Sequence, residues 1–299
     1  MPAPLVFDRS LVRLRRQRAC TLGPVTFLIE RVAQDLSERL SAILRTFALA
    51  ADVGSPTDAV RRILAVHPTV GTVIAVDPIR VCLAARPGLK VAADEEALPF
   101  ADGALDLVVS ALALQSVNDL PGVLVQIRRA LKPDGLFLAC LLGGDTLNEL
   151  RQSFAAAEAQ IEGGLSPRVA PFPDLRDMGA LLQRAGFALP VTDVDRLTVR
   201  YASPLALLHD LRRMGAGNAL SERRRTPLRR ATLMRMLEIY GDTFADADGK
   251  VRATFEIIWL SGWAPHESQQ QPLRPGSARA RLADALGTTE ISVDEKARR

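Results

Sequence analysis

The segment from Gly88 to Gly144 constrains the fold most strongly, because apolar runs alternate there with turn-forming and helical stretches. The runs LDLVV at 105–109 and LFLACLL at 136–142 each follow a breaker, Ala-Asp-Gly in the first case and Lys-Pro-Asp-Gly in the second. We therefore expect two buried parallel strands. Between them Pro121 can open a helix, whose apolar residues recur at helical spacing: Leu124, Ile127 and Leu131. A strand, a helix and a second strand predict a right-handed crossover in an α/β fold.

The residues before this segment predict the first half of the same sheet. An amphipathic helix is expected from Phe27 to Phe47, since apolar residues fall at three- and four-residue steps with charged residues between them. The runs FALAADV at 47–53 and TVIAV at 72–76 are expected to form buried strands, with a helix over about 58–66 between them. The fold class that follows is α/β with a central, mostly parallel sheet.

The last part of the chain adds helices and a final strand. Helices are expected over 145–161, 174–185, 204–214 and 226–240, and short β-type segments over 187–194 and 197–201. The run VRATFEIIWLSGW at 251–263 has the β-branched and aromatic content of a strand. We expect four parts: an N-terminal helical segment at 1–46, a main domain built from 47–201 and 251–263, a helical lid inserted at 202–250, and a flexible tail at 270–299.

Polar residues follow the ends of four successive predicted strands. In open α/β sheets, ligands bind outside the carboxyl ends of the strands, so these residues are expected to line one crevice. Asp77, just before Pro78, has the alternative interpretation of a helix cap. The ordered series favours a cofactor crevice over four independent caps. Its expected lining is Asp52, Gly54, Ser55, Asp77, Asp94, Glu95 and Ser110.

The charge of the chain does not indicate nucleic-acid binding, although the formal net charge is +4 and the pI is near 9.3. The basic residues are almost all arginines scattered among acids, with one dense group at 9–18 and another at 223–230. We expect each group to form a solvated helix face, and an acidic protein or a membrane surface stays open as an alternative contact.

Two further classes of protein are not indicated. No apolar run approaches the roughly 20 residues of a spanning helix, and the N-terminus lacks the apolar core of a signal peptide. The cysteines, Cys20, Cys82 and Cys140, are too few and too far apart for a disulfide framework, so a reducing compartment is expected. With three histidines in the chain, no metal site is expected.

Several short runs resemble a known family. They are FDR at 7–9, DEEALPF at 94–100, VNDLP at 117–121, LKPDG at 131–135, GGDTL at 143–147, EGGLSP at 162–167 and HESQ at 266–269. The second, third and fourth are shared with many class I S-adenosylmethionine (SAM) methyltransferases, including the biotin-pathway enzyme that methylates a malonyl thioester. The last three are more specific. Together the runs resemble the methyltransferase-like assembly factors of respiratory complex I, over about residues 7–269.

This resemblance implies a fold, a cofactor and a partner. The fold would be the Rossmann-like class I SAM-methyltransferase fold, closed by 251–263 as an antiparallel last strand. SAM would be the cofactor, with Asp77 on its ribose and Asp94 near its adenine amino group. The partner would be a protein subunit of complex I, an iron–sulfur subunit in particular, modified by methylation or arginine hydroxylation. A cytoplasmic location is expected, with peripheral association at the inner face of the membrane as an alternative.

The chain departs from the family pattern at two places. The first loop has Gly54-Ser55-Pro56 where a Gly-x-Gly pattern is usual, and Pro56 lacks an N–H donor, so weak cofactor binding is expected. Gln115-Ser116 stands where the family carries His-Trp, and no catalytic residue is identified. Two hypotheses follow: a SAM-dependent enzyme, or a catalytically degenerate assembly chaperone. A nicotinamide dehydrogenase is disfavoured, because no G-x-G-x-x-G follows the first strand.

Overall fold

The computed structural model of the chain describes residues 5–270, 284 and 287–288. The chain divides into two compact units, Met1–Pro265 and His266–Arg299. The first unit holds the sheet. The predicted flexible tail at 270–299 lies almost entirely outside the described residues.

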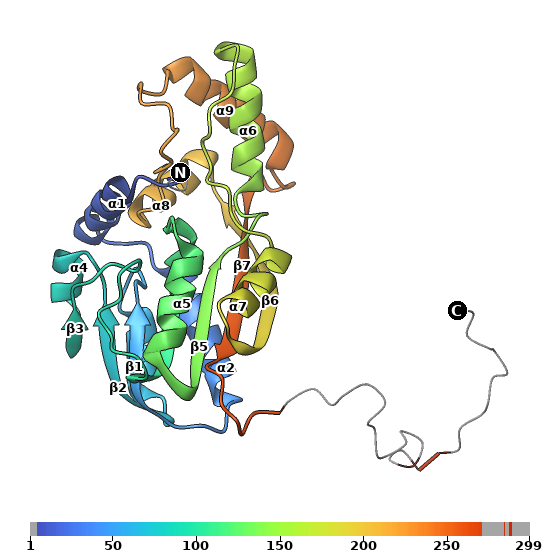
Figure 1. Cartoon of the computed structure of the whole chain (residues 1–299). Coiled ribbons are helices and arrows are strands. Elements are labelled where there is room, and N and C mark those ends of the chain that lie inside the picture. Colours follow the sequence, from blue (N-terminus) through green and yellow to red (C-terminus); the bar gives the residue numbers. More distant parts are fainter. Residues whose placement is uncertain (1–4, 271–283, 285–286, 289–299) are drawn as a thin grey trace. The chain divides into compact units, whose positions relative to one another are not determined.

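A seven-stranded sheet forms the centre of the described chain, in the order β3-β2-β1-β4-β5-β7-β6 (Figure 1). Strands β1 to β5 pair in parallel, whereas β7 runs antiparallel to both β5 and β6. This arrangement confirms the predicted fold class, including the antiparallel last strand. The bounds are β1 Phe47–Val53, β2 Val70–Val76, β3 Leu89–Val91, β4 Leu105–Ala111, β5 Leu131–Leu142, β6 Ala188–Tyr201 and β7 Val251–Trp263.

Helices pack on both faces of this sheet and close two apolar cores. One core lies between one face of the sheet and helices α2, α3, α6, α8 and α9. The other core lies between the opposite face of the sheet and helices α5 and α7. Burial on both faces explains why β1, β4 and β5 are continuous apolar runs rather than alternating ones. The bounds are α1 Arg9–Leu22, α2 Phe27–Ser41, α3 Ala59–Val66, α4 Arg80–Ala84, η1 Leu114–Ser116, α5 Leu120–Ala130, α6 Asn148–Ile161, α7 Leu175–Arg184, α8 Pro204–Arg213 and α9 Arg230–Phe244.

Several predicted boundaries were wrong. The helix predicted over 226–240 is α9, Arg230–Phe244, and the helix predicted over 145–161 begins at Asn148. Helix α2 ends at Ser41 rather than 47, because the chain turns toward β1 and leaves Leu44 fully exposed. Strand β6 is continuous, and the polar residues that suggested a gap, Asp195 and Arg196, stay paired with β7. Strand β5 begins at Leu131, because the predicted breaker forms an irregularity inside the strand, with Asp134 at φ 64°.

The carboxyl ends of β1, β2 and β4 lie on the side of the sheet where α1 and α8 are found (Figure 1). Helix α1 contacts both α8 and α4. Its start is fixed by Asp8, whose side chain accepts a hydrogen bond from the Leu11 N–H and whose own N–H donates to the Ala219 carbonyl at 2.9 Å. The chain therefore places an N-terminal helix over the edge of the sheet where a ligand would bind.

Candidate cofactor site

The predicted crevice residues come together at the carboxyl ends of β1 to β4. Asp52 lies in β1, Asp77 follows β2, and Ser110 lies in β4. Their side chains are buried, as are those of Ser55 and Glu95. Gly54 has φ +73°, a conformation that L side chains rarely adopt, and a Cβ there would lie 2.8 Å from Cγ of Glu95. Glycine at this position thus permits the close approach of the β1 loop and the Asp94-Glu95 loop.

Asp52 has unused hydrogen-bonding capacity in the crevice, as do guanidinium nitrogens of Arg9 and Arg86. Its Oδ1 accepts a short hydrogen bond from the Ser55 hydroxyl, whereas its Oδ2 is buried without a partner among the described residues. Burial raises the pKa of Asp52 to about 6, against the lowering effect of the Ser55 hydrogen bond and the Arg86 charge. A buried, unsatisfied carboxylate oxygen is costly, so it marks a place where a ligand donor would be favourable.

Two serines in the crevice have structural roles. The Ser110 hydroxyl donates to the Val53 carbonyl at 2.7 Å, and this bond joins β4 to β1. The Ser55 hydroxyl oxygen accepts from the Ala111 N–H at 3.2 Å while its proton goes to Asp52. These serines shape the loop after β1, and a hydroxyl retains further acceptor capacity for a ligand.

Three arginines of α1 extend into the crevice. The Arg16 guanidinium contacts the Asp77 carboxylate at 2.8 Å, the Glu95 carboxylate at 3.0 Å and the Gly54 carbonyl at 2.9 Å. Arg9 pairs with Asp94 at 2.8 Å and with Glu95, and Arg13 pairs with Asp94. The prediction that this arginine group forms a solvated helix face was therefore wrong. Buried carboxylates attract the guanidinium groups, because a buried charge is tolerated when it is paired.

Sequence reasoning missed Arg86, a buried arginine just after α4. Its guanidinium donates to the Asp77 carboxylate at 2.9 Å and to the Ser55 carbonyl at 2.8 Å. Asp77 also accepts from the Ile79 N–H at 2.8 Å, so the predicted helix-cap interaction exists beside the ion pairs. Asp77 is thus held by a backbone N–H and two guanidinium groups. No local pattern around Arg86 distinguishes it from the exposed arginines of the chain.

Asp94 is less buried than the other crevice acids. Burial tends to raise its pKa, but the hydrogen bonds from the Glu96 N–H and from Arg9 outweigh that effect and lower it. Asp94 therefore stays ionised and anchors the N-terminal part of α1.

The cysteines were predicted to be too few and too far apart for a disulfide framework, but one pair is bonded. Cys20 in the last turn of α1 is bonded to Cys82 in α4, with 6.0 Å between the Cα atoms, while Cys140 is a buried free thiol. The cysteines are 62 residues apart, so their spacing in sequence carries no signal of the pairing. The fold brings them together by laying α1 beside α4.

The region of Gln115-Ser116 forms η1 beyond β4. The Gln115 amide donates to the Leu112 carbonyl at 2.8 Å, and its Oε1 is buried without a partner among the described residues. Leu112 has φ 52°, which is uncommon for a non-glycine residue. Gln115 thus supports a strained turn, and the structure offers no group there with the acid–base character of histidine.

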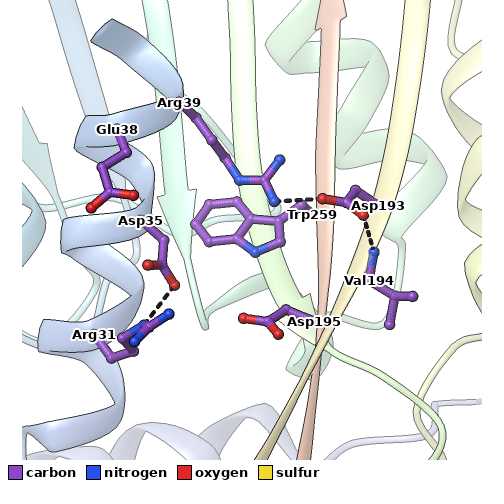
Figure 2. Close-up of a pocket in the computed structure, with 8 residues that line it drawn as sticks. All are labelled: Arg31, Asp35, Glu38, Arg39, Asp193, Val194, Asp195 and Trp259. Atoms are coloured by element: carbon purple, nitrogen blue, oxygen red, sulfur yellow. Dashed lines mark hydrogen bonds and ion pairs between the residues drawn. The ribbon is translucent and has the colours of Figure 1, made fainter. Parts of the chain in front are cut away.

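A separate hollow of about 420 Å³ lies between α2, β6 and β7 (Figure 2). The Arg39 guanidinium lies 4.4 Å from the ring centroid of Trp259 and pairs with Asp193 at 2.6 Å, and Arg31 pairs with Asp35 at 3.0 Å. None of the predicted site residues lines this hollow. The Arg39–Asp193 ion pair connects α2 to β6, and Arg31–Asp35 lies within α2, so we assign the hollow a packing role.

Comparisons with known proteins give the family and the fold class of the chain. The family described as "Methyltransferase domain" matches residues 51–139. The chain is 37% identical over 298 residues to "Arginine-hydroxylase NDUFAF5, mitochondrial" of Danio rerio, covering 97% of this chain and 92% of that protein. It is 35% identical over 287 residues to "Malonyl-[acyl-carrier protein] O-methyltransferase" of Laribacter hongkongensis, covering 90% and 94%. Among solved structures, a candidate methyltransferase from Bacillus halodurans superposes with TM-score 0.54 at 16% identity, covering 78% and 98%.

The sheet order and the crevice at its carboxyl ends define a class I methyltransferase fold. Within that class, the chain belongs to the family of the arginine-hydroxylase NDUFAF5. Nowhere in the part of the chain that the structure describes is a helix both long and apolar enough to span a bilayer.

Proposed function

We propose that the chain binds SAM in the crevice at the carboxyl ends of β1 to β4 and modifies a protein subunit during assembly of respiratory complex I. The observation that carries the cofactor assignment is the buried Oδ2 of Asp52, which has no partner among the described residues, beside Gly54 with its positive φ. Family membership supports the protein substrate, since the zebrafish relative is named an arginine-hydroxylase. The modified subunit would be an iron–sulfur subunit, and the reaction arginine hydroxylation or methylation.

The residues of the crevice suit SAM. Asp77 would accept the two ribose hydroxyls, and Oδ2 of Asp52 would accept from the ammonium group of the methionine moiety. The absence of a Cβ at Gly54 lets the backbone come close to the ligand. When bound, SAM supplies an electrophilic methyl group on a positively charged sulfur. The carboxylate of Asp52, which forms no ion pair among the described residues, favours such a cation in this crevice.

The helical segment at 202–250 would form the protein-binding side of the site. It contributes α8, which contacts α1, and α9, which packs on α6. Several of its arginines are already paired, for example Arg223 with Asp8 at 3.1 Å and Arg224 with Glu162 at 3.0 Å. The partner would therefore be a protein rather than a nucleic acid. We propose a cytoplasmic location, with peripheral association at the inner face of the membrane.

A degenerate assembly chaperone is the second candidate, and a specific observation favours it. Asp77 and Glu95 are neutralised by the chain's own arginines, and the loop Gly54-Ser55-Pro56 offers one donor fewer than a Gly-x-Gly loop. A pure chaperone would use the fold as a binding surface and would not need the crevice carboxylates.

A cell-based substitution series separates the two candidates. Asp77→Ala and Asp94→Ala should abolish complex I activity in cells that depend on this protein, while the purified variants keep wild-type helix content by circular dichroism. The matched control is Asp102→Ala, which removes an exposed carboxylate paired only with Arg129 and should leave complex I activity unchanged. Full complex I activity with both crevice variants would refute the enzyme and support the chaperone.

A further inference from the structure

One face of α1 carries both the residues that fill the crevice and the cysteine of the disulfide. Arg9, Arg13, Arg16 and Cys20 follow one another at steps of four, three and four residues. Residues at such steps lie on the same face of a helix. The three arginines contact the crevice carboxylates, and Cys20, one turn beyond Arg16, is bonded to Cys82 of α4. The same helix face therefore closes the crevice and is covalently attached beside it.

Arg16 and a bound ribose compete for the same carboxylate. Asp77 is 0% exposed and already accepts hydrogen bonds from the Ile79 N–H, Arg16 and Arg86. An ionised carboxylate has about four lone-pair sites, so two ribose hydroxyls cannot be added while both guanidinium groups stay in place. Arg16 also holds the Gly54 carbonyl and Glu95, which border the expected path of the methionine moiety. Cofactor binding at Asp77 therefore requires one guanidinium group to leave. The side chain of Arg86 is 3% exposed and also holds the Ser55 carbonyl, whereas that of Arg16 is 13% exposed, so we expect Arg16 to be displaced.

Access to the crevice also depends on α1. The side chains of Glu95 and Arg16 are only 2% and 13% exposed, because α1 covers the loops that carry Asp77 and Glu95. The disulfide attaches the last turn of α1 to α4, and α4 begins three residues after Asp77. Since Arg16 is only four residues from Cys20, the bond limits how far Arg16 can move from Asp77.

We infer that Cys20 and Cys82 form a redox switch that controls access of the cofactor to the crevice. The disulfide keeps the arginines of α1 on the crevice carboxylates, and the dithiol lets α1 move away so that the cofactor can reach Asp77. This inference rests on the proposed SAM-binding function. Cofactor affinity would then depend on the thiol–disulfide balance of the surroundings as well as on cofactor concentration.

The chemistry of the switch is thiol–disulfide exchange with a low-molecular-weight thiol. Cys20 is partly exposed and Cys82 is 7% exposed, so an external thiolate attacks the sulfur of Cys20 and Cys82 leaves as a thiolate that takes up a proton. A second external thiol then attacks the mixed disulfide and frees Cys20. The pair thereby gains two electrons and two protons, and two external thiols become one disulfide. Cys140, fully buried in β5, takes no part.

The binding test uses S-adenosylhomocysteine, the demethylated form of SAM, on the full chain. We expect its dissociation constant, measured by isothermal titration, to be about tenfold lower or better for reduced than for oxidised wild type. The Cys20→Ser/Cys82→Ser double variant should bind like reduced wild type under both conditions, which controls for other effects of the reductant. Equal affinity of oxidised and reduced wild type would overturn the switch alone. No binding in any sample would overturn the proposed cofactor site, and the gating with it.

A ligand-free measurement tests the movement of α1 directly. Hydrogen–deuterium exchange of the α1 amides should speed up when wild type is reduced, and it should be fast in the double variant in either state. Amides of β4, in the core, serve as the internal control and should be unaffected. Identical α1 exchange in oxidised and reduced wild type would contradict the switch, whatever the binding data show.

Discussion

Asp52 is a buried acid whose ionised form is disfavoured, so it couples stability to pH. Its pKa is raised from 3.8 to about 6, and each pKa unit corresponds to about 1.4 kcal/mol. Because its pKa is raised in the folded state, Asp52 makes a contribution to the free energy of unfolding that is fully present below pH 3.8. This contribution is lost as the pH rises through about 6. At neutral pH the folded chain therefore holds Asp52 in its ionised form, which lowers the free energy of unfolding. Such a cost is typical of a functional site.

Asp52→Asn should stabilise the chain at neutral pH, by up to about 3 kcal/mol, because it removes the cost of the buried charge. The difference in unfolding free energy between variant and wild type should be close to zero near pH 4 and should grow up to about pH 7. Urea denaturation at several pH values measures it, and the exposed Asp102→Asn is the control. A difference that does not change with pH would contradict the raised pKa. The variant should also lose affinity for S-adenosylhomocysteine.

Pro56 limits the number of backbone donors in the first loop. Pro56→Gly restores an N–H, and a hydrogen bond to a charged ligand contributes about 1.5 to 3 kcal/mol, so cofactor affinity should rise roughly tenfold or more. The unfolding free energy should fall by about 1 kcal/mol, since glycine makes the unfolded chain more flexible. Pro171→Gly, in the exposed loop before α7, is the matched control for flexibility. Unchanged affinity in a folded Pro56→Gly variant would show that this loop does not limit binding.

At the scale of secondary-structure elements, α1 acts as a competitor of the cofactor. Arg16→Gln leaves Arg86 on Asp77 and Arg9 on Glu95, so the crevice stays partly neutralised and the chain should still fold. The cofactor then no longer has to displace a charge-assisted hydrogen bond, and the dissociation constant for S-adenosylhomocysteine should fall roughly tenfold. Arg18→Gln, on the exposed side of the same helix, should have no effect. Weaker binding by Arg16→Gln would mean that Arg16 helps to hold the cofactor.

The disulfide between α1 and α4 should also stabilise the folded chain. It closes a loop across 62 positions, and loops of this length lose about 4 kcal/mol of unfolded-state entropy at 25 °C in the chain-entropy model. We expect Cys20→Ser/Cys82→Ser to lower the midpoint of chemical denaturation relative to oxidised wild type. Reduced wild type should match the double variant. If oxidised wild type and the double variant unfold at the same denaturant concentration, the disulfide does not constrain the chain in solution.

Elements with strong local patterns were predictable from the sequence, and others were not. Helix α5 and strands β1, β4 and β7 agree with the predicted ranges within one or two residues, since apolar periodicity and breakers define them. Strand β6 was divided in two by its polar residues, because an edge strand tolerates charge that a central strand would not. The contacts of α1 with the crevice could not be predicted from local sequence, since its ion pairs with Asp77 and Glu95 form only when distant parts of the chain fold together.

At the scale of the whole molecule, the fold and the crevice followed from the order of strands and strand-end residues. Asp52, Asp77 and Glu95 were placed together because the carboxyl ends of neighbouring parallel strands meet at one edge of the sheet. Arg86 could not be found in this way, because no motif marks it. The Cys20–Cys82 bond could not be found either, because the two cysteines are 62 residues apart in the sequence. Their discovery changes the interpretation of the site from an open crevice to one closed by α1.

The most direct test of the cofactor crevice is a crystal structure of the reduced protein soaked with S-adenosylhomocysteine. We expect the ribose hydroxyls on Asp77, the ammonium group on Oδ2 of Asp52, and the Arg16 guanidinium displaced from Asp77. Electron density for the ligand elsewhere, with Arg16 still bound to Asp77 and Glu95, would contradict it.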